Sequence, residues 1–437
     1  MNSNIDNLYV LDGRVPVVKA LPFGLQHVLA MFVSNITPII ILSNIVGLDS
    51  TTSGALIQNC MIIAGIGTII QLYPLWRIGS RLPIVMGVSF TFLSIAIAVA
   101  TTQGMGTLMG AVIIGGIVEG ILGLFAKYWT RLIWPVVAAT VVTGIGFSLL
   151  PIGANSFAGG QGAADFGSAT NWIIGTVTLL VSLAAQVYLK GVAKSLSVLF
   201  GLIVGYVLSL CMGVISFNGI SDLPIVSLPH FLPFTPEFNL GAILSIVAIF
   251  LVSATETIGD TSALCNGALK REPTQKELGA SVSCDGFVSS VAGLMGCTPI
   301  TSFSQNIGLA AMSGVVNRFT IATGATIMII GGIFPAIGFM LTTIPQAVLG
   351  GCTIMMFGCI LVAGVQMLSR CGFSQRNMVI ASLSLSVGLG FTQIPDIFNI
   401  FPDIIKTVFA NNSVAVVFLL AVLLNLILPK ETKEQIQ

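Results

Sequence analysis

Charge is what this sequence has least of. Among its 437 residues, 8% are charged and 55% are hydrophobic, whereas a soluble domain carries roughly 25% charged residues. The mean hydropathy of +1.01 is correspondingly high. The sequence therefore predicts an all-α protein that crosses a membrane many times, because helices satisfy their own backbone polar groups in lipid.

Several classes of function lack their signatures. The eight cysteines are scattered without CxxC spacing, so neither a metal site nor a disulfide framework is expected. No GxSxG or HExxH motif is present, which argues against a membrane enzyme with a nucleophile and a base. A net charge of +1 without a basic cluster argues against binding of nucleic acid. No catalytic residue and no cofactor is expected.

Long apolar runs are abundant. A helix needs roughly 20 apolar residues to cross a bilayer. Fourteen such runs can be placed, at 23–46, 52–73, 83–100, 107–127, 131–150, 171–189, 195–215, 239–258, 278–295, 299–314, 319–342, 345–369, 377–393 and 411–429. Two of them, 83–100 and 299–314, are short and begin at or next to a proline.

The basic residues fall in alternate connections between these runs. Those on one side are Arg14, Lys19, Arg77, Arg81, Lys127, Arg131, Lys190, Lys194, Lys270, Arg271, Lys276, Arg318, Arg370, Arg376, Lys430 and Lys433. The intervening connections contain Asp49, Asp165, Asp222, Glu237, Asp396 and Asp403, with Lys406 as their single base. Because basic connections face the cytoplasm, we expect an inner or plasma membrane protein with both termini in the cytoplasm.

Fourteen runs divide into two sets of seven, and an odd number per set inverts the second set in the membrane. The two short runs are the third of each set. Pro83 precedes Ser89-Phe90-Thr91, and Pro299 precedes Ser302-Phe303-Ser304. This predicts a seven-plus-seven inverted repeat, in which the third and tenth segments are broken half-helices preceded by short extended stretches. Their free N-terminal ends would face a shared centre.

Polar residues interrupt the apolar sequence close to the second short run. Glu256 lies near the end of an apolar run, Asp285 lies within the next run, and Gln305 and Asn306 lie in the short run itself. A carboxylate at bilayer depth costs several kcal/mol unless it meets a partner, a proton or water. These residues therefore indicate a polar pocket for a small solute at the middle of the membrane.

The same residues resemble a known family. The segment QNIGLAAMSG at 305–314 is similar to the signature of the nucleobase–ascorbate transporters, Gln/Glu-Asn-x-Gly-x4-Thr-Arg/Lys/Gly. Further similar positions are Gln26-His27, ETIGD at 256–260, Asp285 and LGGCTIMMFG at 349–358. Ser313 stands where the family usually has threonine, and it retains the hydroxyl.

The resemblance implies a binding site for a nucleobase. Glu256 and Gln305 would bind the edge of the base. A carboxylate can accept two neighbouring N–H bonds, and a carboxamide can read an adjacent C=O and N–H. Backbone N–H groups near Thr91 and Ser304 would meet the remaining carbonyls, and Phe92 would stack on the ring. For His27 the resemblance implies a role in the same site.

Other residues would support the site or couple it to an ion. Asp285 and Glu256 would change protonation or partner during transport. Asp260 would hydrogen-bond the backbone of the tenth segment and hold the helix break open. Asn306 would be a hydrogen-bonding prop beside Gln305, with Gln26 in a supporting role. For Glu119, in the fourth run, we expect a structural pairing with another polar group rather than a ligand role.

The expected substrate is a purine base, xanthine or uric acid or both, taken up by proton symport. In the family, xanthine and urate carriers have glutamine where uracil permeases have glutamate, and Gln305 fits the former. Thr91 resembles the urate-accepting members. Sodium coupling, a uracil or pyrimidine permease of the same family, and an anion transporter with the same seven-plus-seven plan remain as alternatives. A channel would not need a solvent-sealed site between moving halves.

The resemblance also implies two interleaved parts. A core would comprise 1–150, which contains the first four spans and runs into the fifth, together with 239–342. A gate would comprise 131–215 and 345–429. The core would move like an elevator against the gate, and two copies would form a homodimer.

Overall fold

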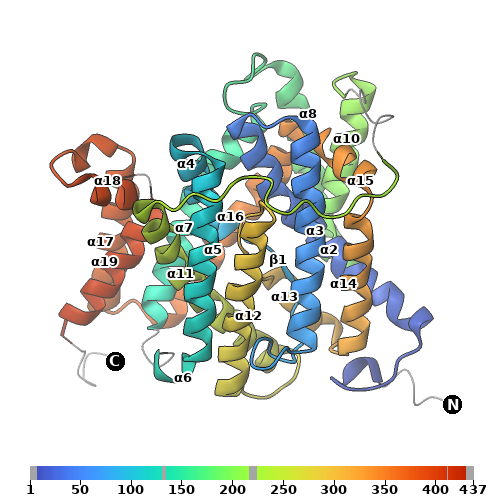
Figure 1. Cartoon of the computed structure of the whole chain (residues 1–437), viewed down its shortest axis with the longest axis horizontal. Helices are drawn as coiled ribbons and strands as arrows, with labels where there is room; N and C mark the ends of the chain where they lie inside the picture. The colour runs from blue at the N-terminus through green and yellow to red at the C-terminus, as the bar shows by residue number, and fades with distance from the viewer. Residues whose placement is uncertain (1–6, 130–133, 216–223, 411, 430–437) are drawn as a thin grey trace.

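The computed structural model of the chain describes residues 7–129, 134–215, 224–410 and 412–429, which are mostly helical (Figure 1). The first half contains η1 (Asn7–Tyr9), α2 (Val17–Val46), α3 (Ser50–Leu72), β1 (Met86–Val88), η2 (Phe90–Phe92), α4 (Leu93–Gln103), α5 (Met105–Leu124), α6 (Ala126–Trp129), α7 (Pro135–Phe157), α8 (Ala169–Tyr188), α9 (Val192–Ser195) and α10 (Ser197–Cys211). The second half contains α11 (Leu240–Gly267), α12 (Gln275–Leu294), β2 (Ile300–Ser302), α13 (Ser304–Ser313), α14 (Arg318–Gly332), α15 (Pro335–Thr342), α16 (Gln346–Cys371), α17 (Gln375–Thr392), η5 (Pro395–Phe398), α18 (Asp403–Phe409) and α19 (Ser413–Ile427).

Each predicted apolar run overlaps one or more of these helices. Within the described ranges, seven helices are long and apolar enough to cross a membrane, or eight if α14 and α15, bent by 82° at their junction, form one span. The segment of η2 with α4, and helices α10 and α19, are apolar but shorter. The chain is therefore a helical, multi-pass membrane protein, and the number of fourteen crossings stays a prediction.

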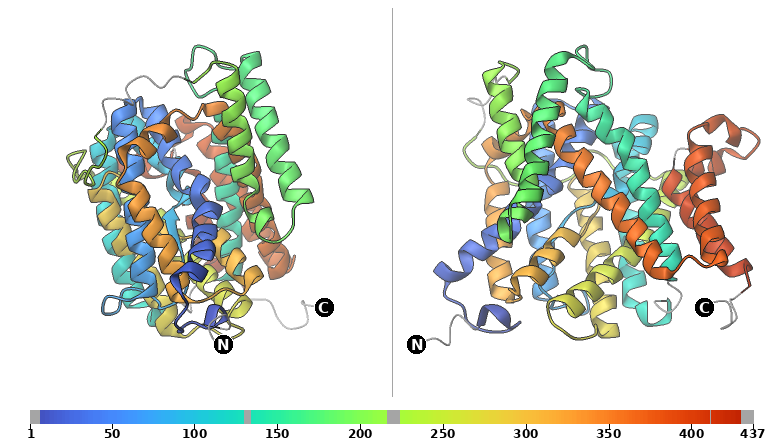
Figure 2. Two further views of the ribbon diagram at one scale, coloured as in Figure 1. Left: turned by 90° about the vertical axis from the view of Figure 1, so that its right-hand side faces the viewer. Right: turned by 180° about the vertical axis from the view of Figure 1, so that it is seen from behind.

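The helices contact one another in two groups. The first bundle consists of α2, α3, α4, α5, α11, α12, α13 and α14, and the second consists of α7, α8, α10, α16, α17 and α19. Figure 2 shows α7, α8, α10 and α16 together on the side turned away from the viewer in Figure 1. The first bundle also encloses the single pair of strands found in the described residues, β1 and β2.

Basic residues from separate connections meet at one end of the molecule. Arg77, Arg81, Lys127, Lys276 and Arg318 line one open cavity of about 880 Å³. The end of α19 and the short η1 helix lie toward this same lower end in Figure 1. The charge pattern predicts that these connections share one side of the membrane, and their convergence in space fits that prediction. Arg131, Asp222, Lys430 and Lys433, which also entered the pattern, lie outside the described residues.

Glycines allow α5 and α12 to pack with their backbones almost in contact. A Cβ added to Gly286 on α12 would lie 2.1 Å from the backbone nitrogen of Gly120 and 2.6 Å from the carbonyl oxygen of Gly116. Small residues permit such close approach of helices in lipid, where association depends on packing rather than on the hydrophobic effect. This contact holds α5 directly against the part of α12 that carries Asp285.

Candidate functional site

Two short strands form the centre of the first bundle. β1 and β2 pair antiparallel, with Met86 opposite Ser302 and Val88 opposite Ile300. Backbone polar groups at bilayer depth need a partner within the protein, and the strands supply it to each other. Side chains complete the set, because Oδ1 of Asn35 accepts the N–H of Val88 over 2.8 Å and the hydroxyl of Thr68 accepts the N–H of Met86 over 2.9 Å.

This pairing brings together the starts of two short helical segments. The η2 turn and α4 follow β1, while α13 follows β2. The strands run antiparallel, so the two segments leave the pair in opposite directions. Each begins with free N–H groups and the positive end of a helix dipole. Extended stretches followed by short helices thus occupy both predicted positions, 83–100 and 299–314.

Glu256 lies on α11 beside the first of these helix starts. The hydroxyl of Thr91 donates to Oε2 of Glu256 over 2.9 Å. Thr91 is buried, whereas Glu256 is partly exposed. One carboxylate oxygen therefore has a hydroxyl donor in the structure, and the carboxylate retains capacity to accept further N–H bonds.

Gln305 lies at the second helix start. It is an exposed residue, and its Nε2 approaches Oγ of Ser34 on α2 at 3.4 Å. The preceding Ser304 donates its hydroxyl to Oδ2 of Asp260 over 2.9 Å. Asp260 is one helical turn beyond Glu256 on α11. This bond therefore holds the beginning of α13 close to the part of α11 that carries Glu256.

Asp260 and Asp285 both accept hydrogen bonds from the residues of the helix break, but from different groups. We predicted that Asp260 would bond the backbone of the tenth segment, but it accepts instead from the hydroxyls of Ser302, over 3.3 Å, and Ser304. The backbone N–H of Ser302 donates to Oδ2 of Asp285 over 2.9 Å. Asp285 reaches this N–H because α12 lies directly behind β2.

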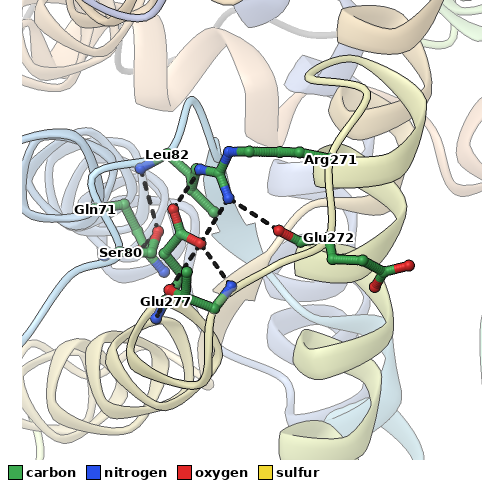
Figure 3. A network of polar contacts seen from close by, with 7 residues as sticks. Gln71, Ser80, Leu82, Arg271, Glu272 and Glu277 are labelled. Atoms are coloured by element: carbon green, nitrogen blue, oxygen red, sulfur yellow. Dashed lines mark hydrogen bonds and ion pairs between the residues drawn. The ribbon is translucent and has the colours of Figure 1, made fainter.

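Asp285 is fully buried and has two further donors. The hydroxyl of Thr257 donates to Oδ2 over 2.6 Å, and Nε2 of Gln71 donates to Oδ1 over 3.2 Å. The side-chain oxygen Oε1 of Gln71 accepts both the N–H and the hydroxyl of Ser80 (Figure 3). Gln71 thus connects Asp285 to the loop that leads into β1, so both strands are anchored to one carboxylate.

His27, Gln26 and Asn306 form a buried group behind the site. His27 is 2% exposed and lies ten residues beyond the start of α2, on which α13 and α14 pack. Nδ2 of Asn306 donates to the carbonyl oxygen of His27 over 2.9 Å and lies 3.2 Å from Nδ1 of its ring. Asn306 therefore connects α13 to α2, as expected of a prop. Nε2 of Gln26 has no hydrogen-bond partner within the described chain.

The aromatic rings near the site are packed against other rings. Phe92 is fully buried and lies 4.6 Å from Phe250, centroid to centroid, at an angle of 57°. Both faces of its ring are covered in this conformation, so stacking on a planar ligand would require Phe92 to move. Phe90 packs edge-on against Phe357 of α16, which belongs to the second bundle.

One side of the site is open. Exposed residues follow one face of α11 and α13 from the site to the ends of these helices: Gly259, Ala263 and Asn266, and Ser304, Gln305, Gly308 and Ala311. α13 also contacts α9, the short helix between α8 and α10. The exposed face, which includes Gln305, therefore lies next to the second bundle.

Sequence reasoning missed several residues of this site. Ser34, Asn35, Gln71, Thr257 and Ser302 each hydrogen-bond an acidic residue, a strand or Gln305. Each is a polar residue within or beside an apolar run, which is a signal available from sequence. Their donors and acceptors, however, belong to residues far away in the chain, so the pairing was not predictable.

Similarity to known proteins extends over nearly the whole chain. Residues 18–397 match the model of a protein family that is described as a permease family. The chain belongs to the nucleobase–ascorbate transporter family. The xanthine permease XanQ of Escherichia coli K12 is 33% identical over 439 residues, covering 97% of this chain and 94% of its own. The uric acid permease PucK of Bacillus subtilis is 33% identical over 386 residues, covering 87% and 89%.

Solved structures with the same fold come from other transporters. The transmembrane domain of the cyanobacterial bicarbonate transporter BicA superposes with a TM-score of 0.62 at 15% identity, covering 92% of this chain and 98% of that domain. Murine Slc26a9, an anion transporter in an inward-facing state, gives a TM-score of 0.63 at 10% identity, covering 93% and 69%. At these identities the similarity concerns the fold alone.

Proposed function

We propose that this permease imports a purine base, xanthine or uric acid or both, by proton symport. The observation that carries the proposal is the placement of Glu256 with Thr91 at one helix start and of Gln305 at the other, where β1 and β2 pair and the Ser304–Asp260 bond holds α13 to α11. The relatives XanQ and PucK are named as xanthine and uric acid permeases. Their names support a purine as substrate.

The chemistry of the site fits the edge of an oxidised purine. Such a ring has N–H donors and C=O acceptors in one plane. Glu256 would accept two N–H groups through its carboxylate, in charge-assisted bonds that are roughly twice as strong as neutral ones. The carboxamide of Gln305 would pair with a neighbouring C=O and N–H. N–H groups at the starts of η2 and α13 would meet the remaining carbonyls. His27 and Phe92 would act from behind the site.

The two bundles support an elevator-like mechanism. We assign the first bundle, within 1–150 and 239–342, to a mobile core that carries the site, and the second, within 131–215 and 345–429, to a gate. The fourteen predicted segments would form a seven-plus-seven inverted repeat around the strand pair, with both termini cytoplasmic. Two copies would contact each other through the gate. The exposed face of α11 and α13 then corresponds to access from the cytoplasm.

Coupling to protons would use the buried acids of the site. Asp285 is held by three neutral donors, and neither it nor Glu256 has a cation in contact among the described residues. Uncompensated carboxylates at bilayer depth favour a proton as the coupling ion. Sodium is the alternative, and carboxylate and hydroxyl oxygens could also serve as its ligands.

An anion transporter is the second candidate, because BicA and Slc26a9 share the fold. In an anion transporter of this fold, the paired helix starts would face the anion. Glu256 argues against this reading, since a carboxylate at the same centre would repel a bare anion. A uracil permease of the same family is the third candidate, and it would be favoured by an acid in place of Gln305.

Uptake of radiolabelled xanthine into cells tests the proposal. We expect saturable uptake that urate inhibits, that uracil inhibits poorly, that a protonophore abolishes and that replacement of sodium leaves intact. Uptake of bicarbonate or another inorganic anion without any xanthine uptake would overturn the proposal. Dependence on sodium would change the coupling ion and leave the substrate assignment in place.

A further inference from the structure

Glu119 differs from the other acids of the first bundle. It lies on α5, its side chain is fully buried, and neither carboxyl oxygen has a hydrogen-bond partner among the described residues. We expected Glu119 to pair with a polar group, and the one polar side chain beside its carboxyl is Ser253, which does not reach hydrogen-bond geometry in this conformation. By contrast, Glu256, Asp260 and Asp285 each accept at least one hydrogen bond.

Three helices, α12, α11 and α4, pack against α5 and surround Glu119. On α12, Gly286 touches the backbone of Glu119, and the adjacent Asp285 acts on its carboxyl electrostatically. On α11, Glu256 acts on it in the same way, and the Ser253 hydroxyl lies beside it. That hydroxyl is also without a partner in the described chain. α4, which packs on α5 as well, contains no ionisable residue.

These neighbours supply two acids and no base. An ionised carboxylate without a donor or a cation is costly at this depth, and nearby acids add repulsion. A protonated carboxyl, in contrast, needs only one acceptor and can point its O–H toward Ser253. The geometry of the site therefore fits Glu119 in its neutral form.

We propose that Glu119 binds the proton that is co-transported with the substrate. This inference rests on the proposed function and makes it more specific: the proton is held by Glu119 on α5, and it reaches Glu119 past Asp285, one of the buried acids of the substrate site. Binding would form an O–H bond between a proton from water outside the cell and the Glu119 carboxylate. Release would break that bond and pass the proton to water on the cytoplasmic side.

A line of polar groups joins Glu119 to the exposed face of α11. Ser253 and Thr257 are four residues apart and share one face of that helix. Thr257 donates to Asp285, and Oγ of Ser302 lies 3.4 Å from the Thr257 hydroxyl and 3.3 Å from Oδ2 of Asp260. Asp260 is partly exposed, beside the exposed Gly259. Small rotations of hydroxyl groups along this line would complete a path for the proton.

The test separates coupling from substrate binding in proteoliposomes. Two rates are measured for the wild type, Glu119→Gln and Glu119→Asp: accumulation of labelled xanthine driven by a proton gradient, and exchange of labelled for unlabelled xanthine without any gradient. We expect Glu119→Gln to retain exchange within about twofold and to lose accumulation at least about tenfold, because only net transport requires binding and release of a proton. Glu119→Asp should restore part of the accumulation. Glu272→Gln, the same change at an exposed glutamate in the loop between α11 and α12, is the matched control and should leave both rates unchanged.

Each outcome has a defined meaning. Accumulation by Glu119→Gln at the wild-type rate would overturn the inference, and so would parallel loss of exchange and accumulation in a variant that stays folded and monodisperse. Absence of xanthine transport in the wild type would instead refute the proposed function.

Infrared spectroscopy of the purified protein gives a readout that needs no substrate. The carbonyl band of a protonated carboxyl should diminish in Glu119→Gln, and an unchanged band would contradict a proton on Glu119.

Discussion

The acids of the site are stabilised by neutral donors. Hydroxyls, an amide and a backbone N–H bond to Glu256, Asp260 and Asp285, whereas the ion pairs of the described residues are Arg271–Glu277 and Arg318–Asp12, away from the site. Neutral donors orient a carboxylate without cancelling its charge. The remaining charge is available to a ligand N–H or to a proton, which is what a carrier that must bind and release its cargo requires.

Glu256→Gln tests the acid that we assign to substrate. The amide offers one acceptor and turns an NH2 group toward a ligand N–H, so one bond is lost and one contact becomes repulsive. A hydrogen bond to a charged group contributes about 1.5–3 kcal/mol, so we expect xanthine uptake to fall about 10- to 100-fold or more. Initial uptake rates at matched membrane expression measure the effect. The exposed Glu272→Gln is again the control, and normal uptake by Glu256→Gln would remove Glu256 from the site.

At this scale the sequence predicted residue types better than their contacts. Glu256, Asp285, Gln305 and Asn306 stand out because they interrupt apolar runs, and the structure brings them to one region with Thr91 and Ser304. The family resemblance does not specify which acid accepts which donor. The backbone N–H expected to bond Asp260 therefore bonds Asp285, and Asp260 accepts from two hydroxyls instead. Phe92 was assigned to ligand stacking, but its packing on Phe250 depends on a residue outside every motif.

At the scale of the elements, the contact between α5 and α12 determines where Glu119 and Asp285 lie. Gly286→Ala would place a methyl group 2.1 Å from the backbone of Gly120, which cannot move without its helix. Overpacking of this kind costs typically 1–3 kcal/mol, so we expect a lower melting temperature in detergent, measured by thermal unfolding. Gly390→Ala on α17 is the matched control, because nothing lies within 4 Å of its Cβ position. Equal melting temperatures for the two variants would contradict this account of the contact.

The start of α12 contains a second testable feature, a capping box. The hydroxyl of Thr274 accepts the N–H of Glu277, while the Glu277 carboxylate accepts the N–H of Thr274 and pairs with Arg271 (Figure 3). Partial burial alone would raise the pKa of Glu277, but the hydrogen bonds from Arg271 and Thr274 outweigh it and leave the pKa lowered. A lowered pKa in the folded state means that the interaction stabilises the protein above the unfolded pKa and is lost as the pH falls through the folded value.

Glu277→Gln should therefore reduce stability at neutral pH and have little effect in acid. Because the pair is partly exposed to solvent, we expect a loss of no more than about 1 kcal/mol at pH 7. The difference from the wild type should shrink below about pH 4, where the wild-type carboxylate becomes protonated. Thermal unfolding in detergent across this pH range measures it. A difference that grows as the pH falls would have the wrong sign for this mechanism.

Helices were predictable from sequence because apolar length is a local property, and both short segments fell where Pro83 and Pro299 indicated. Their strands were predictable only as extended stretches. The register of Met86 opposite Ser302 arises from the packing of α2, α3 and α12 around the pair. Helix ends were less predictable, since α2 starts at Val17, six residues before the apolar run expected to begin at residue 23.

At the scale of the whole molecule, two regions of access lie at different ends of the site. One is the exposed face of α11 and α13 that includes Gln305. The other is a cavity of about 440 Å³ between the bundles, whose lining includes Asn44, Ser94 and Gln346. Ser94 is three residues beyond Thr91, and the Phe90–Phe357 contact joins the two bundles nearby. In an elevator mechanism these regions would serve substrate alternately, because movement of the core exposes one site to either side.

Accessibility labelling tests this arrangement in a background without the native cysteines. With the basic connections in the cytoplasm, a cysteine replacing Gln305 should react with a membrane-impermeant maleimide added to inside-out vesicles, and substrate should slow the reaction. A cysteine replacing Ser94 should instead react from outside, in right-side-out vesicles, because its cavity opens at the opposite end. The physical reason is that an exposed face between two bundles fills with water, whereas maleimide does not react with a thiol buried in protein or lipid. Labelling does not require activity, so it remains informative even if Gln305→Cys abolishes transport. Reaction of position 305 from neither side would place that face against lipid and remove the path that connects Gln305 to the cytoplasm.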